Sequence, residues 1–234
     1  MNDRQQPTVA QAGLGLDVWC EPDAEATLLQ TELAFIDPDD RKRRALLLYE
    51  LGRVQLAAGD DPTAAQAFLE SYKLRPQFRP TLRAARLLYV TREDFQLAIK
   101  LLDAEARATR DPLARASLLR LQARLRWSTL GDLPGARSVL EQAYRIDAAD
   151  LATIKLQVLL ATVDRDEAGL RSALLRQLET VADKELRVAL MVDLALLLAP
   201  TDASAAIDTL DSAARSAPGS LAVQCYLEQL YEAE

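Results

Sequence analysis

Histidine is absent from this chain of 234 residues, and only two cysteines occur, Cys20 and Cys225, near opposite ends. Histidine is the side chain most often used for general acid–base catalysis and is the commonest metal ligand. Without histidine, and with two cysteines so far apart, the usual zinc and haem sites are excluded. The sequence also lacks a glycine-rich phosphate loop and a nucleophile beside a base. We therefore expect no metal, no cofactor, no catalytic residue and no enzyme activity.

Aromatic residues and positive charge are also scarce. Aromatic side chains make up 5% of the chain, the formal net charge is −7 and the pI is about 4.9. Nucleic-acid-binding proteins normally carry a basic stripe and a high pI, so we expect no nucleic-acid partner. The densest positive stretch runs from Arg107 to Arg126, where acidic neighbours indicate solvated helix faces.

Targeting and membrane-spanning signals are missing as well. The N-terminus shows no basic segment followed by an apolar core, so no signal peptide is predicted. No uninterrupted apolar run reaches the roughly 18 residues expected of a membrane span. Two distant cysteines fit a reducing compartment, and we expect a cytoplasmic protein.

Alanine and leucine are abundant, and half of the chain is apolar. Both residues are strong helix formers, whereas the β-branched residues that favour strands are sparse. The 8 glycines and 10 prolines lie in short clusters between long stretches without them, which predicts an all-α protein. Acidic residues fall at the turns before several helices, where capping explains them best: Asp39-Asp40, Asp60-Asp61 and Asp164/Asp166.

One pattern recurs along the chain: a turn, then a small residue, then a large apolar residue four positions later. It occurs at 59–68, 93–102, 131–140 and 201–210. The small residues are Ala64, Ala98, Ala136 and Ala206, and the first two are 34 residues apart. Such self-similarity at a period of 20 to 50 residues indicates a repeat architecture.

The stretch 45–78 closely resembles a tetratricopeptide repeat. The matching residues are Leu51-Gly52, Gly59, Ala64, Phe68, Tyr72, Leu74 and Pro76. Gly52 and Ala64 are small enough for two helices to approach closely, and Phe68 and Tyr72 are expected to fill the space beneath them. Trp127, further along, is expected in the core of its own repeat. The resemblance implies an α-solenoid of antiparallel helix pairs, a tetratricopeptide superhelix, which acts as a non-catalytic scaffold for protein–protein interaction.

The resemblance also sets the expected domain organisation. Residues 24–234 would form the solenoid, with repeats at about 45–78, 79–112, 117–150, 151–186 and 187–220, and partial repeats at both ends. The fourth repeat keeps the apolar period but lacks the signature small residue. Residues 1–23 would form an N-terminal segment that is disordered, covers the open end of the first helix pair or lies in the groove. The mixed spacing also resembles that of large multi-repeat proteins of GC-rich bacteria.

Members of this family bind ligands on a concave face lined by the first helix of each pair. Carried over position by position, the resemblance places these residues on that face: Tyr49, Arg53, Leu56, Arg83, Leu87, Leu121, Leu125, Lys155 and Leu159. The fifth repeat would add Val188, Met191, Ala195, Leu198 and Ala199. An apolar channel with a few cations suits a partner peptide or helix that presents apolar anchors and carboxylates.

Two other functions stay open at this point. Exposed repeat ends could self-associate, which would make the protein a homo-oligomeric structural assembly component. Alternatively, the chain could be the N-terminal regulatory or sensor part of a longer multi-repeat protein.

Overall fold

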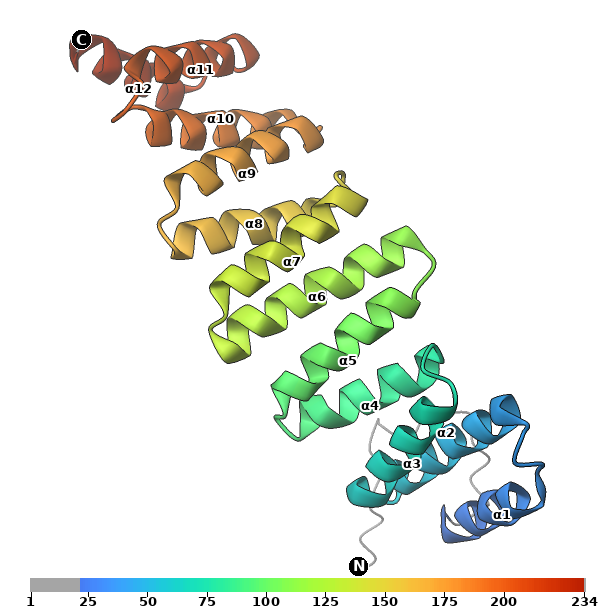
Figure 1. Cartoon of the computed structure of the whole chain (residues 1–234). Coiled ribbons are helices and arrows are strands. Elements are labelled where there is room, and N and C mark those ends of the chain that lie inside the picture. The colour runs from blue at the N-terminus through green and yellow to red at the C-terminus, as the bar shows by residue number, and fades with distance from the viewer. Residues whose placement is uncertain (1–21, 234) are drawn as a thin grey trace, which may run out of the picture. The chain divides into compact units, whose positions relative to one another are not determined.

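A computed structural model of the chain describes residues 22–233 and contains α-helices but no strand within that range (Figure 1). The chain divides into two compact units, and the boundary in the sequence lies between Arg92 and Glu93. This boundary falls inside the expected second repeat, 79–112. The expected N-terminal segment lies outside the described residues except for its last two positions, and so does Cys20.

The first unit contains four described helices. These are α1 (Pro22–Phe35), α2 (Arg41–Ala57), α3 (Asp61–Leu74) and α4 (Arg79–Thr91), and each packs against the next. Gly59 closes the turn between α2 and α3 with a φ of 81°, a conformation that glycine adopts without strain. A Cβ on Gly52 would lie 2.6 Å from the ring of Phe68, which is 1% exposed. The close approach expected of Gly52 and the filling role of Phe68 are thus confirmed.

The inner side of α3 also carries a buried polar contact. Ser71 donates a hydrogen bond to the carbonyl of Ala45 in α2 at 2.7 Å, and its Oγ lies 2.8 Å from Oγ1 of Thr81 in α4. Both hydroxyl residues are buried, so the three helices are tied together where water cannot compete. The expectation for Tyr72 was wrong: it is 37% exposed, because Ser71 occupies the inward position of that turn.

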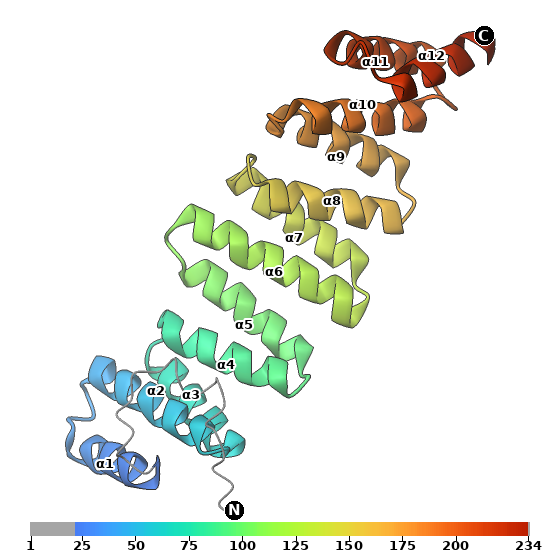
Figure 2. The same ribbon diagram turned by 180° about the vertical axis from the view of Figure 1, so that it is seen from behind.

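The second unit contains eight described helices. These are α5 (Phe95–Ala108), α6 (Pro112–Leu130), α7 (Leu133–Ile146), α8 (Leu151–Val163), α9 (Glu167–Thr180), α10 (Lys184–Leu198), α11 (Ala203–Ser216) and α12 (Leu221–Ala233). Views from opposite sides show these helices side by side in chain order, joined by short turns (Figures 1 and 2). The second unit is therefore a stack of antiparallel helix pairs.

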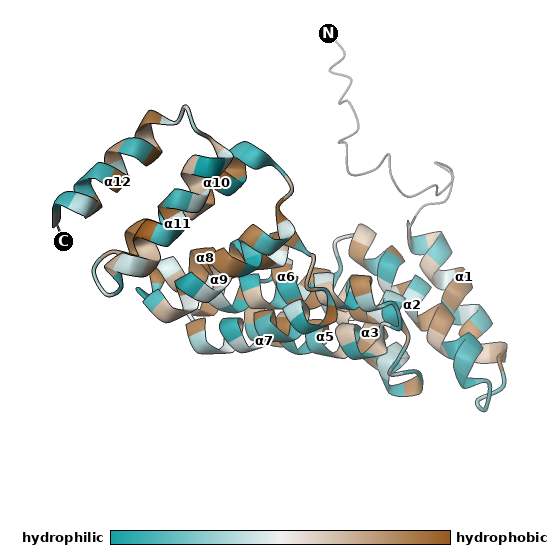
Figure 3. Ribbon diagram, turned by 90° about the horizontal axis from the view of Figure 1, so that it is seen from above, coloured by the Kyte–Doolittle hydropathy of each residue, from teal (hydrophilic) through white to brown (hydrophobic). Residues whose placement is uncertain are grey.

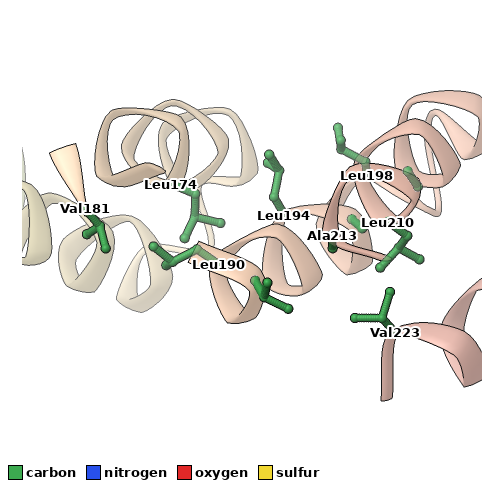
Figure 4. Packing of buried hydrophobic residues seen from close by; sticks show 11 residues of the cluster. Leu174, Val181, Leu190, Leu194, Leu198, Leu210, Ala213 and Val223 are labelled. Carbon is green, nitrogen blue, oxygen red and sulfur yellow. The ribbon is translucent and has the colours of Figure 1, made fainter. Parts of the chain in front are cut away.

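Small and large apolar residues alternate in the core of the second unit. One cluster joins α5 to α8 around Ala123, Ala136 and Leu140, and Trp127 packs against it as expected. A second cluster joins α9 to α12 through Leu174, Leu194, Leu210 and Val223, among others (Figure 4). Each helix thus buries its apolar side against its neighbours in the stack, as in other repeat proteins.

Aspartate begins most of the described helices. Its side chain accepts a hydrogen bond from a backbone N–H in the first turn of nine of them, α2, α3 and α5 to α11. Asp60, for example, accepts from the N–H of Thr63 at 3.2 Å. These bonds satisfy donors that a helix end otherwise leaves free. The expected capping role is confirmed at Asp40, Asp60 and Asp166.

Candidate functional site

The helix pairs of each unit present a first and a second helix. The first helices are α2 and α4 in the first unit, and α6, α8 and α10 in the second. We refer to the solvent-exposed side of these helices as the first-helix face. All of the residues proposed from the sequence as a binding surface lie on first helices, but they differ in exposure.

On the first unit, the first-helix face combines exposed leucines with an exposed arginine. Leu87 of α4 is 49% exposed and Leu46 of α2 is 45% exposed. Arg83 lies one turn before Leu87 and is also exposed. Within the described part of the chain, Arg83 has no ion-pair partner. An apolar anchor point and an available cation therefore lie next to each other on α4.

The first unit also contains two cation–π contacts, between Arg53 and Tyr49 and between Arg75 and Phe78, whose rings touch each other. The guanidinium of Arg53 lies 5.7 Å from the ring centre of Tyr49, and that of Arg75 lies 4.9 Å from the ring of Phe78. The two rings meet edge to face at 5.6 Å. Arg53 also pairs with Glu50 on its own helix at 3.0 Å, so its charge is already partly neutralised. Tyr49, Arg53 and the nearby Leu56 are half-buried.

On the second unit, α8 presents a comparable surface. Lys155 is exposed, and Leu159 one turn later is 44% exposed. Val163, a further turn along, is 53% exposed. Lys155 has no ion-pair partner among the described residues. The pairing of a cation with apolar side chains at helical spacing is thus found on both units.

Solved structures of known proteins have this architecture. A TPR repeats protein from Bacteroides fragilis matches with a TM-score of 0.57 at 13% identity, over 85% of this chain and 99% of the other. The chain has the tetratricopeptide-repeat (TPR) fold. The C-terminal part of a TPR repeat-containing protein from Cytophaga hutchinsonii matches with a TM-score of 0.53 at 12% identity, over 86% of this chain and 80% of the other. No family model and no curated protein sequence matches the chain.

The TPR register differs from the expected one in α10. Val188, Ala195 and Leu198 were expected on the binding face, but they are 8%, 1% and 4% exposed. Ala195 is the equivalent of Gly52, because each is a small residue that directly follows a buried leucine. Ala195 lies seven residues before its helix cap, Asp202, whereas Gly52 lies eight residues before its helix cap, Asp60. The segment from this small residue to the cap of the second helix is thus one residue shorter in the fifth repeat than in the first. The residues of α10 that were expected to be exposed therefore point into the core. The exposed residues on α10 are instead Lys184, Glu185, Leu186, Ala189, Asp193 and Leu196.

A similar shift affects α6, the first helix of the third TPR. Leu121 and Leu125, both proposed from the sequence, are half-buried. The exposed side of α6 carries Ser117, Arg124 and Ser128. The middle of α6 is therefore more polar than the sequence predicts, whereas Leu113 and Leu130 at its two ends are 58% and 41% exposed. The exposed apolar side chains of the second unit's first helices thus come from α6, α8 and α10.

Three arginines of the arginine-rich stretch form ion pairs with described residues of this chain. Arg107 pairs with Asp103 at 2.6 Å, and Arg126 pairs with Asp132 at 2.7 Å. Arg120 pairs with Asp150, the cap of α8. Burial raises the pKa of Asp150, but the hydrogen bond from Thr153 and the charge of Arg120 outweigh it and hold the pKa below its ordinary value.

Residues 22–233 contain neither a candidate metal site nor a candidate membrane span. No group of three or more histidine, cysteine, aspartate or glutamate side chains in this range could hold a metal ion. None of the helices in the same range is both long and apolar enough to cross a membrane.

Proposed function

We propose that this protein is a non-catalytic scaffold that binds a partner peptide or helix on its first-helix face. The observation that carries the proposal is the pairing of an unpartnered cation with an exposed leucine one turn away, Arg83 with Leu87 on α4 and Lys155 with Leu159 on α8. The preferred partner has apolar side chains spaced along one side and carboxylates between them.

The exposed leucines supply the favourable free energy of binding. Leu87 and Leu159 each leave nearly half of their surface in water. Covering the remainder would contribute roughly 1 kcal/mol per residue. The helices that carry them are already held by their own cores, so little ordering entropy is lost on this side of the complex when a peptide docks.

The cations supply selectivity for acidic partners. The chain has a net charge of −7, so its overall field repels acidic segments. Arg83 and Lys155 reverse that preference locally, because neither is neutralised by a described neighbour. A partner carboxylate would pair with them at the edge of the apolar contact, which fixes orientation more than it adds affinity.

The test compares the native chain with two matched double variants as bait for lysate proteins. The site variant is Arg83→Glu with Leu87→Glu. The control variant is Arg171→Glu with Leu175→Glu on α9, a second helix; it changes the same residue types at the same spacing, and Leu175 is 43% exposed. All four positions are exposed, so both variants are expected to fold, which circular dichroism checks.

A protein captured by the native chain and by the control, but lost by the site variant, would support the proposal. Equal capture by all three would place the contact elsewhere and contradict it. Loss by both variants would also contradict it, since the effect would then follow from added negative charge and not from the first-helix face.

A further inference from the structure

A polar hollow of about 360 Å³ lies on the second unit, on the side of the second helices. Its walls are α5 and α7, which contribute Lys100, Ser138 and Gln142 among others, and its floor is α6, which contributes Gln122 and Arg126. It is formed by different helix sides from the first-helix face, and nothing in the proposed function uses it.

The next repeat contains the equivalent hollow, and there the charged groups are paired internally. Arg176 of α9 bonds to Glu141 at 2.8 Å and to Gln157 at 3.1 Å, and it stacks over the ring of Tyr144 at 4.0 Å. Arg137 pairs with Asp164 and Asp166 at 2.9 Å each. All four charged residues that line this second hollow, Arg137, Glu141, Asp166 and Arg176, are thereby neutralised.

The two hollows correspond position by position. Gly135, Ser138 and Gln142 of α7 stand where Gly169, Ser172 and Arg176 stand in α9, 34 residues later. The arginine that fills the second hollow is therefore replaced by a shorter, neutral glutamine in the first. The space and the hydrogen-bonding capacity that Arg176 occupies in one repeat stay available in the other.

Several donors in the α5–α7 hollow are unused. Gln122 is 3% exposed, and its side chain makes no hydrogen bond with any described residue. Its amide atoms are not fully buried, unlike the unpaired Nε of Arg126 beside it, so the amide reaches the open space of the hollow, where it can meet a ligand or water. Lys100, Ser138 and Gln142 likewise have no side-chain partner within residues 22–233.

The charges around the hollow favour an anion. Asp103 at the rim is neutralised by Arg107 at 2.6 Å, and Arg126 is held by Asp132 at 2.7 Å. Of the charged residues that line the hollow, only Lys100 has no counter-ion among the described residues. A hydrogen-bond donor set with one net positive charge matches a carboxylate, which accepts up to about four hydrogen bonds.

We propose that this hollow binds the carboxylate of an acidic side chain from a bound polypeptide. Lys100 pairs with the carboxylate, and the amide of Gln122 donates to it from the floor. A polypeptide is favoured over a free small acid because the hollow is shallow and open to solvent. A free acid would gain only these polar contacts, whereas a peptide adds contacts along α5 and α7.

The experiment titrates the isotopically labelled full chain and follows the side-chain amide signals of Gln122 and Gln142 by NMR. The probe is a short capped peptide with one glutamate between apolar residues. Three controls accompany it: the same peptide with glutamine in place of glutamate, free succinate, and sodium chloride at matched ionic strength. Lys100→Met removes the cation of the hollow, and Lys73→Met removes an exposed cation on α3, a second helix that belongs to neither proposed site, as a matched control.

The glutamate peptide is expected to shift both amide signals, and the glutamine peptide to leave them in place. Lys100→Met is expected to weaken binding at least about tenfold, and Lys73→Met to leave it unchanged. An absence of shifts at millimolar peptide, or equal weakening by both variants, would overturn the site. Succinate binding as tightly as the peptide would overturn the assignment to a polypeptide. Since none of these readouts uses Arg83, Leu87, Lys155 or Leu159, failure of the first-helix face would not affect them.

Discussion

The close contact between Gly52 and Phe68 predicts that Gly52→Ala destabilises the native chain but stabilises a chain in which Phe68 is replaced by a smaller residue. In an ordinary helix interior, Gly→Ala stabilises by about 1 kcal/mol. At Gly52, however, the new methyl group would lie 2.6 Å and 2.8 Å from two ring carbons of Phe68. That ring is 1% exposed and cannot move away freely. Overpacking of this kind costs about 1–3 kcal/mol, so Gly52→Ala is expected to destabilise the native chain by about 1 kcal/mol.

Shortening the ring should reverse the result. Phe68→Leu removes the Cε1 and Cζ atoms that meet the new methyl group, and the δ carbons that remain can turn away because they no longer belong to a rigid ring; its own cost is about 1–2 kcal/mol. In that background Gly52→Ala is expected to stabilise by up to about 1 kcal/mol, because only the helix propensity term is left. The coupling between the two substitutions is then about 2 kcal/mol, within the usual range for residues in contact.

Urea unfolding followed by far-ultraviolet circular dichroism measures these free energies, and a constant m-value checks that the unfolding reaction is unchanged. Gly59→Ala is the matched control. Gly59 has a φ of 81° with no atom near its Cβ position, so its cost of about 1 kcal/mol should be the same in both backgrounds. Equal effects of Gly52→Ala with Phe68 and with Leu at position 68 would refute the steric reasoning.

Two further predictions concern ion pairs in the second unit. Asp150→Asn keeps a helix cap but loses the charge facing Arg120, so it should lower stability by about 1 kcal/mol at pH 7. Because the folded pKa of Asp150 is lowered, this deficit should shrink as pH falls below about 4, and thermal melts of both proteins at pH 7 and pH 3 measure it. Arg176→Ala should lower the free energy of unfolding by about 1–2 kcal/mol, because the contacts with Glu141 and Tyr144 are lost. A double-mutant cycle with Glu141→Ala, measured by urea unfolding, should show that the two effects are coupled, and additive effects would contradict the interaction.

The helix pairs and their close contacts could be predicted because they depend on local patterns. The turn at Gly59, the cap at Asp60 and the close approach at Gly52 all follow from residue types at fixed spacing within one repeat. Tyr72 was predicted wrongly because an aromatic residue matched the family pattern, whereas the structure uses Ser71 to face inward and bond to α2 and α4.

The exposed side of the first helices was harder to predict because its positions depend on turn length. A single residue fewer between Ala195 and Asp202 rotates the expected face of α10 into the core. The α5–α7 hollow could not be predicted at all. Its residues come from three helices, and its character depends on which groups lack partners: Lys100 and Gln122 look ordinary in the sequence, and only their neighbours show that they are unused.

The aspartate caps account for part of the negative charge of the chain. Nine of the 35 acidic residues are carboxylates whose oxygen holds the first turn of a helix. Asparagine caps a helix about as well as aspartate does. Exchanging all nine would add nine to the formal charge of −7 and give +2, while every cap kept an acceptor oxygen. The overall charge can thus drift between acidic and basic over evolutionary time without altering how the helices begin, so a low isoelectric point here reflects architecture as much as the choice of partner.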